Sequence, residues 1–279
     1  MFFETQFLPM AGEVGLLPVI TWFFMLVTFY AFVANAIFAL ATRTSVAPVH
    51  RNSRTLTAII AVVAGISYYF IQEYYRHMLA EVADTEDPVA GGLLEQVSFS
   101  AINQLRYIDW AVTTPLLLLK TTQMLRVRFV QAPLAITIML LADLLMVITG
   151  YIGEQQVLAD GTMLVGAKLI WGGISTVFYL IIPIVLFRFW VRYRAQAHPE
   201  EQRAFRLMAL TTVTTWGVYP LGYVASVLPN VDMDWIHISF SVADVLNKVG
   251  VGFIAYLASV QVLKRQVTED EVIKGYSVS

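Results

Sequence analysis

Seven long apolar stretches dominate the sequence and leave few folds open to it. Each is long enough to cross the hydrocarbon layer of a bilayer as a helix, which takes about 20 apolar residues. Short polar segments with Pro or Gly separate them, so successive helices are expected to run antiparallel in one bundle. The sequence predicts an all-α membrane protein, a single seven-transmembrane-helix domain over 1–279. The stretches lie at about 14–42, 55–80, 99–125, 133–152, 163–187, 207–228 and 235–263.

Composition argues against the other broad classes of protein. Charged residues make up 14% of the chain, against roughly 25% in soluble domains, which is too few to coat a water-facing surface. The chain has no Cys, which excludes disulfides, thiolate chemistry and Cys-based zinc sites. Its four histidines form no helical i, i+4 pair, so no metal site is expected. A net charge of −2 argues against a nucleic-acid partner.

Basic and acidic residues alternate between the connecting segments. Segments 1–13, 81–98, 153–162 and 229–234 contain acids but no Lys or Arg, whereas the intervening segments and the C-terminal tail hold most of the basic residues. Lys and Arg accumulate in short cytoplasmic loops. This pattern predicts an outside N-terminus, an inside C-terminus and an odd number of spans. No basic region precedes the first span, so it is expected to be retained rather than cleaved.

Nine charged residues remain in or near the spans. A charge at the bilayer centre costs about 2.5–3.5 kcal/mol on insertion scales, so such residues usually face the bundle interior and mark ion or proton pathways. Two of them, Arg76 and Lys168, lie near outer span ends and are expected to extend toward the interface. The others are Glu73, Arg106, Asp109, Lys120, Asp143, Asp244 and Lys248.

Lys248 lies near the middle of the seventh stretch. Asp244 is on the same helical face and lies one turn closer to the outside than Lys248. Asp109 is expected at the same depth in the third stretch, with Arg106 three residues outward. Such a lysine can form an ion pair or react with an aldehyde to give a Schiff base. Lys120 follows Asp109 on one face, about 16 Å along the axis. These residues predict a ladder of protonatable groups across the membrane.

Three motifs resemble those of the microbial (type 1) rhodopsins. Residues 106–119 (RYIDWAVTTPLLLL) resemble the third helix of that family, residues 216–220 (WGVYP) the sixth, and residues 244–250 (DVLNKVG) the retinal-binding seventh. The motifs occur in the family's order and within the predicted spans. Together they are far more specific than any one of them alone.

The resemblance implies a chromophore and roles for the ladder. Lys248 would carry all-trans retinal as a protonated Schiff base, with Asp109 as primary counter-ion and proton acceptor and Asp244 as second counter-ion. Arg106 would gate the outward side, and Thr113 would hydrogen-bond Asp109.

The resemblance also implies a retinal pocket, although Tyr74 and Tyr223 could equally serve ordinary helix packing; the motifs make this less expected for Trp110, Trp216 and Tyr219. Two tyrosines, Tyr74 and Tyr219, would bond to Asp244. The implied pocket residues are Trp110, Thr114, Leu117, Asp143, Met146, Gly150, Trp171, Ser175, Thr176, Trp216, Tyr219 and Tyr223.

The implied function is a light-driven outward proton pump in a bacterial inner membrane, not an enzyme. The alternative is a slow-cycling sensory photoreceptor that signals to a transducer protein; a third class, a transporter without pigment, would stay colourless. A chloride pump is disfavoured because the Asp109 carboxylate would repel the anion. A sodium pump of the known kind has an acid where Thr113 stands. Family members commonly form trimers or pentamers.

The chain departs from the family at the cytoplasmic donor, where Lys120 replaces the usual carboxylic acid. Lys120 could be neutral in the dark, take up a cytoplasmic proton and pass it on, or it could mark a poor pathway and a slow cycle. It could also extend to an interface that holds Arg126 and Arg128. A histidine that pairs with the primary counter-ion in many relatives is missing, since the alignment places Phe70 there.

Other positions suggest finer properties. The resemblance implies a green-absorbing pigment, because Leu117 stands where a polar residue can shift the absorption of marine relatives to the blue. Gly172 opens a place for a carotenoid antenna in some relatives, although Gly172 and Gly173 could simply let helices approach. Candidates for an outer release group, each of which could instead be a solvated surface residue, are Glu73, Glu95, Asp232, Asp234 and His237.

Overall fold

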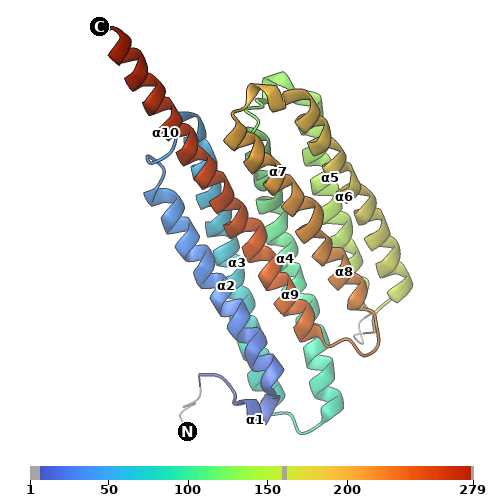
Figure 1. Cartoon of the computed structure of the whole chain (residues 1–279). Coiled ribbons are helices and arrows are strands. Elements are labelled where there is room, and N and C mark those ends of the chain that lie inside the picture. The colour runs from blue at the N-terminus through green and yellow to red at the C-terminus, as the bar shows by residue number, and fades with distance from the viewer. Residues whose placement is uncertain (1–6, 159–161, 278–279) are drawn as a thin grey trace.

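The structure is a computed structural model that describes residues 7–158 and 162–277. Within them the long helices form seven antiparallel rods (Figure 1), which confirms the predicted all-α bundle. Two rods are interrupted: the sixth joins α7 and α8 through the 3₁₀ turn η4, Thr215–Gly217, and the seventh joins α9 and α10 through the π-helical turn η5, Leu246–Gly250. The helices are α1 (Ala11–Val14), α2 (Leu16–Ala41), α3 (Arg51–Ala83), α4 (Pro88–Gln123), α5 (Pro133–Glu154), α6 (Val165–Tyr193), α7 (Pro199–Thr214), α8 (Val218–Ala225), α9 (Met233–Val245) and α10 (Val251–Ser277).

The rods close into a ring in chain order. Each rod from α2 to α6 packs on the next, α7 packs on α10, and α9 returns to α2. The ring encloses an interior in which apolar clusters surround buried charged side chains. Charged side chains on α4 and on the last rod can therefore meet across this interior.

Prolines begin several helices earlier than the apolar pattern predicts. Asp87 caps α4 by accepting a 2.9 Å hydrogen bond from the main-chain nitrogen of Val89, and Pro88 occupies the first turn, where its missing N–H costs nothing. Residues 88–98, predicted as a loop, are therefore helical. The predicted break at His198–Glu201 is likewise the start of α7, with Pro199 in its first turn.

The sixth rod changes geometry where its sequence motif lies. Pro220 has no N–H to donate to the carbonyl one turn earlier, and the turn before it, Thr215–Gly217, is 3₁₀ rather than α-helical. The interruption places Trp216 and Tyr219 at the border of α7 and α8, where both reach the bundle interior.

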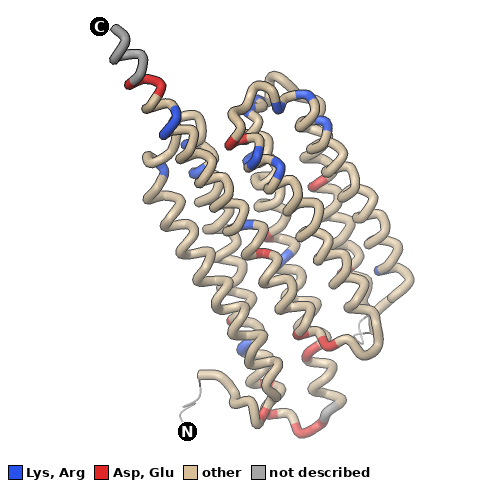
Figure 2. The backbone as a smooth tube through the Cα atoms, in the orientation of Figure 1, with Lys and Arg blue, Asp and Glu red and all other residues tan. Residues whose placement is uncertain are grey.

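Five helical segments of the described residues are long and apolar enough to cross a membrane by length and composition. The third and sixth rods are missing from this set; the third, α4, carries charges such as Arg106, Asp109 and Lys120. Figure 2 shows acids mainly at the N-terminal end of the bundle, basic residues mainly at the opposite end, and a few of both midway. The five segments are Leu16–Ala41, Pro48–Ala83, Pro133–Glu154, Val165–Gln196 and Met233–Glu271.

Candidate functional site

Lys248 lies between two carboxylates in the middle of the bundle. Its Nζ forms an ion pair with Oδ2 of Asp109 on α4 and another, 3.0 Å long, with Oδ1 of Asp244 on α9. All three side chains are buried. The structure thus brings together the lysine and the two acids that the spacing of the sequence placed at one depth.

Asp244 is surrounded by hydrogen-bond donors. Tyr68 and Tyr219 donate to its two oxygens at 2.8 and 2.7 Å, and Trp110 Nε1 lies 3.4 Å from Oδ1. The prediction that Tyr74 fills this role is wrong, because Tyr74 lies on an exposed face of α3 and Tyr68 is the residue turned inward. With Lys248 as well, this carboxylate has four hydrogen-bond donors.

Asp109 has far fewer partners. Its Oδ2 meets Lys248, while Oδ1 is buried with no hydrogen-bond partner among the described residues. Thr113 lies one turn away as predicted, but its hydroxyl donates to the main-chain carbonyl of Asp109 at 2.9 Å. Hydrogen bonds to the charged form stabilise a carboxylate, so Asp109 is the less stabilised of the two anions.

Arg106 lies beside Asp244, with its Nη1 3.6 Å from Oδ2, and donates to Tyr68 at 2.7 Å. Its guanidinium is buried against the rings of Tyr68 and Phe240, and Nε and Nη2 have no partner in the described part of the chain. Two acids, a lysine and an arginine therefore form one buried cluster without net charge.

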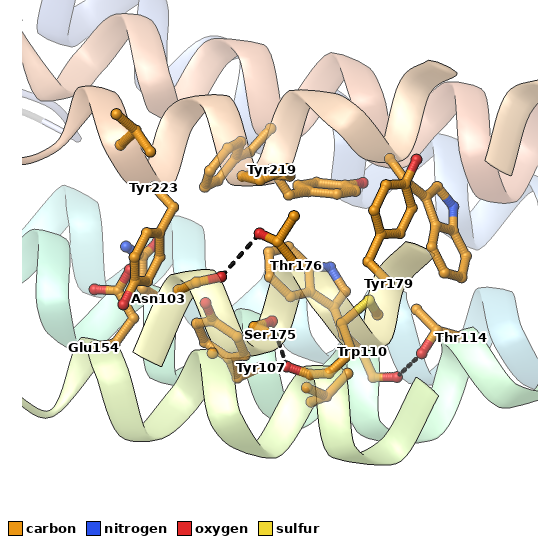
Figure 3. Close-up of a pocket in the computed structure, with 18 of the residues that line it drawn as sticks. Asn103, Tyr107, Trp110, Thr114, Glu154, Ser175, Thr176, Tyr179, Tyr219 and Tyr223 are labelled. Carbon is orange, nitrogen blue, oxygen red and sulfur yellow. Dashed lines mark hydrogen bonds between the residues drawn. The ribbon is translucent and has the colours of Figure 1, made fainter. Parts of the chain in front are cut away.

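A cavity of about 270 Å³ extends from this cluster between α4, α5, α6 and the sixth rod. Figure 3 shows Asn103, Glu154 and Tyr223 together at one end of the cavity and Thr114 and Tyr179 toward the other. Lys248 and Asp244 also line it. Its walls are mostly aromatic and apolar, with the lysine amine among them, which suits a long apolar molecule joined to that amine.

Most of the predicted pocket residues line this cavity. Asp143 lies behind the wall, where its Oδ2 accepts a 2.9 Å hydrogen bond from Thr114. Trp171 is also absent from the lining and turns toward Gly153 of α5. The predicted residues that line the cavity are Trp110, Thr114, Leu117, Met146, Gly150, Ser175, Thr176, Trp216, Tyr219 and Tyr223.

Several lining residues escaped the sequence analysis. Tyr107 and Asn247 belong to the recognised motifs, so the motifs could have indicated them. Glu154 had been assigned to an outer loop because it follows the fourth apolar stretch. The others, including Phe99, Asn103, Tyr179 and Phe240, give no signal in a single sequence.

Glu154 and Lys168 form a buried ion pair, 3.0 Å long, at one end of the cavity. The ammonium also lies 5.1 Å from the centre of the Tyr223 ring. The expectation that Lys168 extends to the membrane interface is therefore wrong, because a carboxylate on the neighbouring rod meets it inside. Arg76, by contrast, is part-exposed and pairs with Glu73 at 3.0 Å.

We expect the single change Lys168→Met to lower the free energy of unfolding by about 3–5 kcal/mol, because it leaves the Glu154 carboxylate buried without a partner. The double change Lys168→Met, Glu154→Leu should cost much less, since neither charge remains. Chemical denaturation in detergent measures both. Equal losses in the single and double variants would contradict this account.

Gly172 lies against the aromatic ring of Tyr223. A Cβ at this position would come 2.5 Å from Tyr223 Cε1, so the close packing of α6 on α8 requires glycine. Packing thus accounts for Gly172 in this chain, and a carotenoid antenna stays a prediction.

A small second cavity of about 20 Å³ lies at the N-terminal end of the bundle. Four of the five predicted release candidates line it, and Asp234 accepts a short hydrogen bond from Tyr75. Burial and the nearby Asp232 charge raise the pKa of Glu95 above its ordinary value. Glu73 is not part of this group. The four are Glu95, Asp232, Asp234 and His237.

Burial excludes one of the three alternatives for Lys120 and contradicts the expected position of Phe70. Lys120 is fully buried, so it does not extend to the interface, and its Nζ has no hydrogen-bond partner among the described residues. Phe70 is exposed on the outside of α3. The alignment that placed it beside Asp109 is therefore wrong.

Comparisons with known proteins match the part of the chain that contains this site. The sequence profile of the bacteriorhodopsin-like protein family matches residues 18–262. Bacteriorhodopsin of Halobacterium salinarum is 30% identical over 210 residues, covering 73% of this chain and 71% of that protein. Green-light absorbing proteorhodopsin of a gamma-proteobacterium is 25% identical over 244 residues, 85% of each chain. The crystal structure of Exiguobacterium sibiricum rhodopsin is 28% identical, covers 88% of this chain and 97% of that one, and has a TM-score of 0.71.

Proposed function

This chain belongs to the bacteriorhodopsin-like protein family, and on that premise we propose that it is a light-driven pump that moves protons out of the cell. The family comprises light-driven transporters and photoreceptors rather than classical enzymes. This chain is a multi-pass protein of the cell membrane. The proposal gives Lys248, Asp109 and Lys120 the roles of proton carrier, acceptor and donor, and places the basic end of the bundle in the cytoplasm.

The cavity fits retinal held by Lys248. It is lined by the rings of Trp110, Trp216 and Tyr219 and by the Lys248 side chain. Retinal linked to that nitrogen would supply the absorption of light and the change of shape that starts each cycle. The protein residues then hold, receive and replace the proton on the nitrogen of Lys248.

The inequality between the two acids is the observation that carries the proposal. Asp244 accepts four hydrogen bonds and lies beside Arg106, so it remains the permanent anion. Asp109 has one partner and one unpartnered oxygen. A proton leaving Lys248 therefore goes to Asp109, because neutralising that carboxylate sacrifices fewer hydrogen bonds.

The outward path continues through Arg106 to the small cavity at the outer end. Once Asp109 is neutral, the charge balance that holds Arg106 near the two acids changes. Arg106 lies against Phe240, one turn from His237 and two turns from the short Tyr75–Asp234 bond. We assign proton release to the group of Glu95, Asp232, Asp234 and His237 around that cavity.

Lys120 is the proposed donor on the cytoplasmic side. Among the residues that the structure describes, its Nζ has no hydrogen-bond partner, and Arg54 is a charged group that acts on it. A buried ammonium beside a guanidinium is unfavourable, which favours the uncharged amine at rest. After Lys248 loses its proton, Lys120 would take up a proton from the cytoplasm and pass it to Lys248.

Illumination of cells that express the protein with all-trans retinal tests the proposal. An unbuffered suspension should become more acidic in light, and a protonophore should abolish the change. A coloured protein that produces no acidification and completes its cycle in seconds would support the sensory alternative instead. A colourless protein would contradict both.

The change Lys120→Met should slow the return of the proton to Lys248 by about 100-fold, the lower range for loss of a positioned proton donor. The preceding transfer to Asp109 should keep its rate. Flash-induced absorbance changes separate the two steps, and Lys264→Met, at an exposed lysine of the same end, is the control. An unchanged return rate would remove Lys120 from the path.

A further inference from the structure

One face of α3 and of the turn before it is polar where a bundle helix is ordinarily apolar. His50, Ser53, Arg54 and Thr57 follow the spacing i, i+3, i+4, i+7, which places them along a single stripe. Each is 1% exposed, so the stripe faces the interior at the basic end of the bundle.

Most of this stripe has hydrogen-bonding atoms without partners. Within the described residues, these are Nδ1 of His50, Oγ of Ser53, and Nε and Nη1 of Arg54, together with Nζ of Lys120 on the facing α4. Buried polar atoms are nearly always hydrogen-bonded, and buried waters typically bond to such groups. A run of unmet donors and acceptors from His50 toward Lys120 is therefore suited to a chain of water molecules that conducts protons.

Glu201 holds His50 at the end of this stripe that is nearest the basic end of the bundle. Its Nε2 lies 2.7 Å from Oε1 of Glu201, which also accepts from Nε of Arg126 at 2.9 Å. Burial alone would raise the pKa of Glu201, but the hydrogen bonds from His50 and Arg126 outweigh it and hold the pKa below its ordinary value. Glu201 is therefore charged at neutral pH and fixes the orientation of the imidazole through Nε2, while Arg126 is part-exposed at the surface.

The Arg54 side chain is itself held in place within the stripe. Its Nη2 donates to Thr42 Oγ1 at 2.6 Å and to the main-chain oxygen of Phe38 at 3.1 Å, and the guanidinium lies over the rings of Phe38 and Tyr256. It is a stationary charge beside Lys120 rather than a proton carrier. The charged and titratable groups at the same end of the bundle as His50 include Arg51, Arg54, Lys120, Arg126, Glu200, Glu201, Tyr256, Lys264 and Arg265.

We propose that His50 is the group through which cytoplasmic protons enter toward Lys120. A proton from the cytoplasm binds Nδ1 of His50, while the N–H group at Nε2 stays hydrogen-bonded to the Glu201 carboxylate. The bond to Nδ1 then breaks as a proton is delivered along the polar stripe and a new N–H bond forms at Lys120, which restores the neutral imidazole. Glu201 and Arg126 act as positioning residues. This inference rests on the proposed pump and on Lys120 as its donor.

Flash spectroscopy of the full-length pigment tests the role of His50. In His50→Gln the return of the proton to Lys248 should be at least about 10-fold slower, while the transfer to Asp109 keeps its rate. The slow step should also lose its dependence on the pH of the medium. Imidazole added to the medium should restore much of the rate.

Two variants separate proton entry from a structural role. His198→Gln is the matched control, because the hydrogen bond from His198 to the Glu201 carboxylate comes from its main-chain nitrogen, and it should behave like the unchanged protein. Arg126→Gln should slow the step yet leave its pH dependence, since the imidazole remains. A slower His50→Gln with the original pH profile and no response to imidazole would reduce His50 to a structural residue.

The unchanged chain provides a test that does not depend on any variant folding. The rate of proton return should fall as the pH of the medium rises, and a flat profile would overturn the inference. Failure of the pump itself would look different, because pigment would not form or illumination would not acidify the medium.

Discussion

The change Lys248→Ala should abolish visible absorption and all light-driven acidification. The buried amine is the one nucleophile within the described lining of the large cavity that can bond an aldehyde covalently, and no neighbouring residue replaces it. Absorption spectra of the purified protein after addition of all-trans retinal measure the loss directly. The exposed Lys264→Ala variant should form pigment normally.

Removing Lys248 also leaves Asp109 and Asp244 without their shared cation. A colourless Lys248→Ala protein must therefore be shown to be folded, for which circular dichroism and its elution in detergent suffice. A pigment that survives in the variant, or borohydride trapping of the chromophore on another residue, would refute the assigned attachment site and with it the proposed pump.

The change Asp109→Asn should reduce light-driven proton export by at least about 100-fold, because a positioned proton acceptor contributes roughly that much or more. Asparagine keeps the size of the side chain but cannot take up the proton of Lys248. Acidification of an illuminated, unbuffered suspension, normalised to the amount of pigment, gives the rate.

Asp143→Asn is the matched control for the acceptor. Asp143 is an equally buried carboxyl on α5, but it bonds to Thr114 rather than to Lys248. Its variant should keep most of the export rate. If the two asparagine variants pump alike, Asp109 is not the acceptor.

The fold was predictable because a membrane restricts the available structures. The lengths of the apolar stretches indicated the rods, but the positions at which the helices begin and end were predicted less well. The start of α4 at Pro88 was missed because the first turns of that helix carry Gly91, Gly92 and Glu95, which look like a loop when only hydropathy is considered. The break at η4 depends on local backbone geometry around Pro220 rather than on hydropathy.

The centre of the site was predictable from spacing, and its periphery was not. Asp244 and Lys248 stand four residues apart on one helix, so a single sequence places them together. Tyr68, Glu154 and His50 depend on which face of a rod turns inward and on how rods from distant parts of the chain meet. Apolar residues cover every face of such helices, which leaves the sequence with little periodicity to indicate the inward side.

The π-helical turn Leu246–Gly250 has a consequence for exchanging parts of this rod with relatives. A π-turn holds one residue more than the α-helix it interrupts, so everything after it is rotated by about 100° relative to an uninterrupted helix. The halves on either side are thus in different registers. A chimera that joins them must conserve the surplus residue, or the face of α10 that carries Ser259 and Tyr256 would swing away from α3 while Asp244 kept its place.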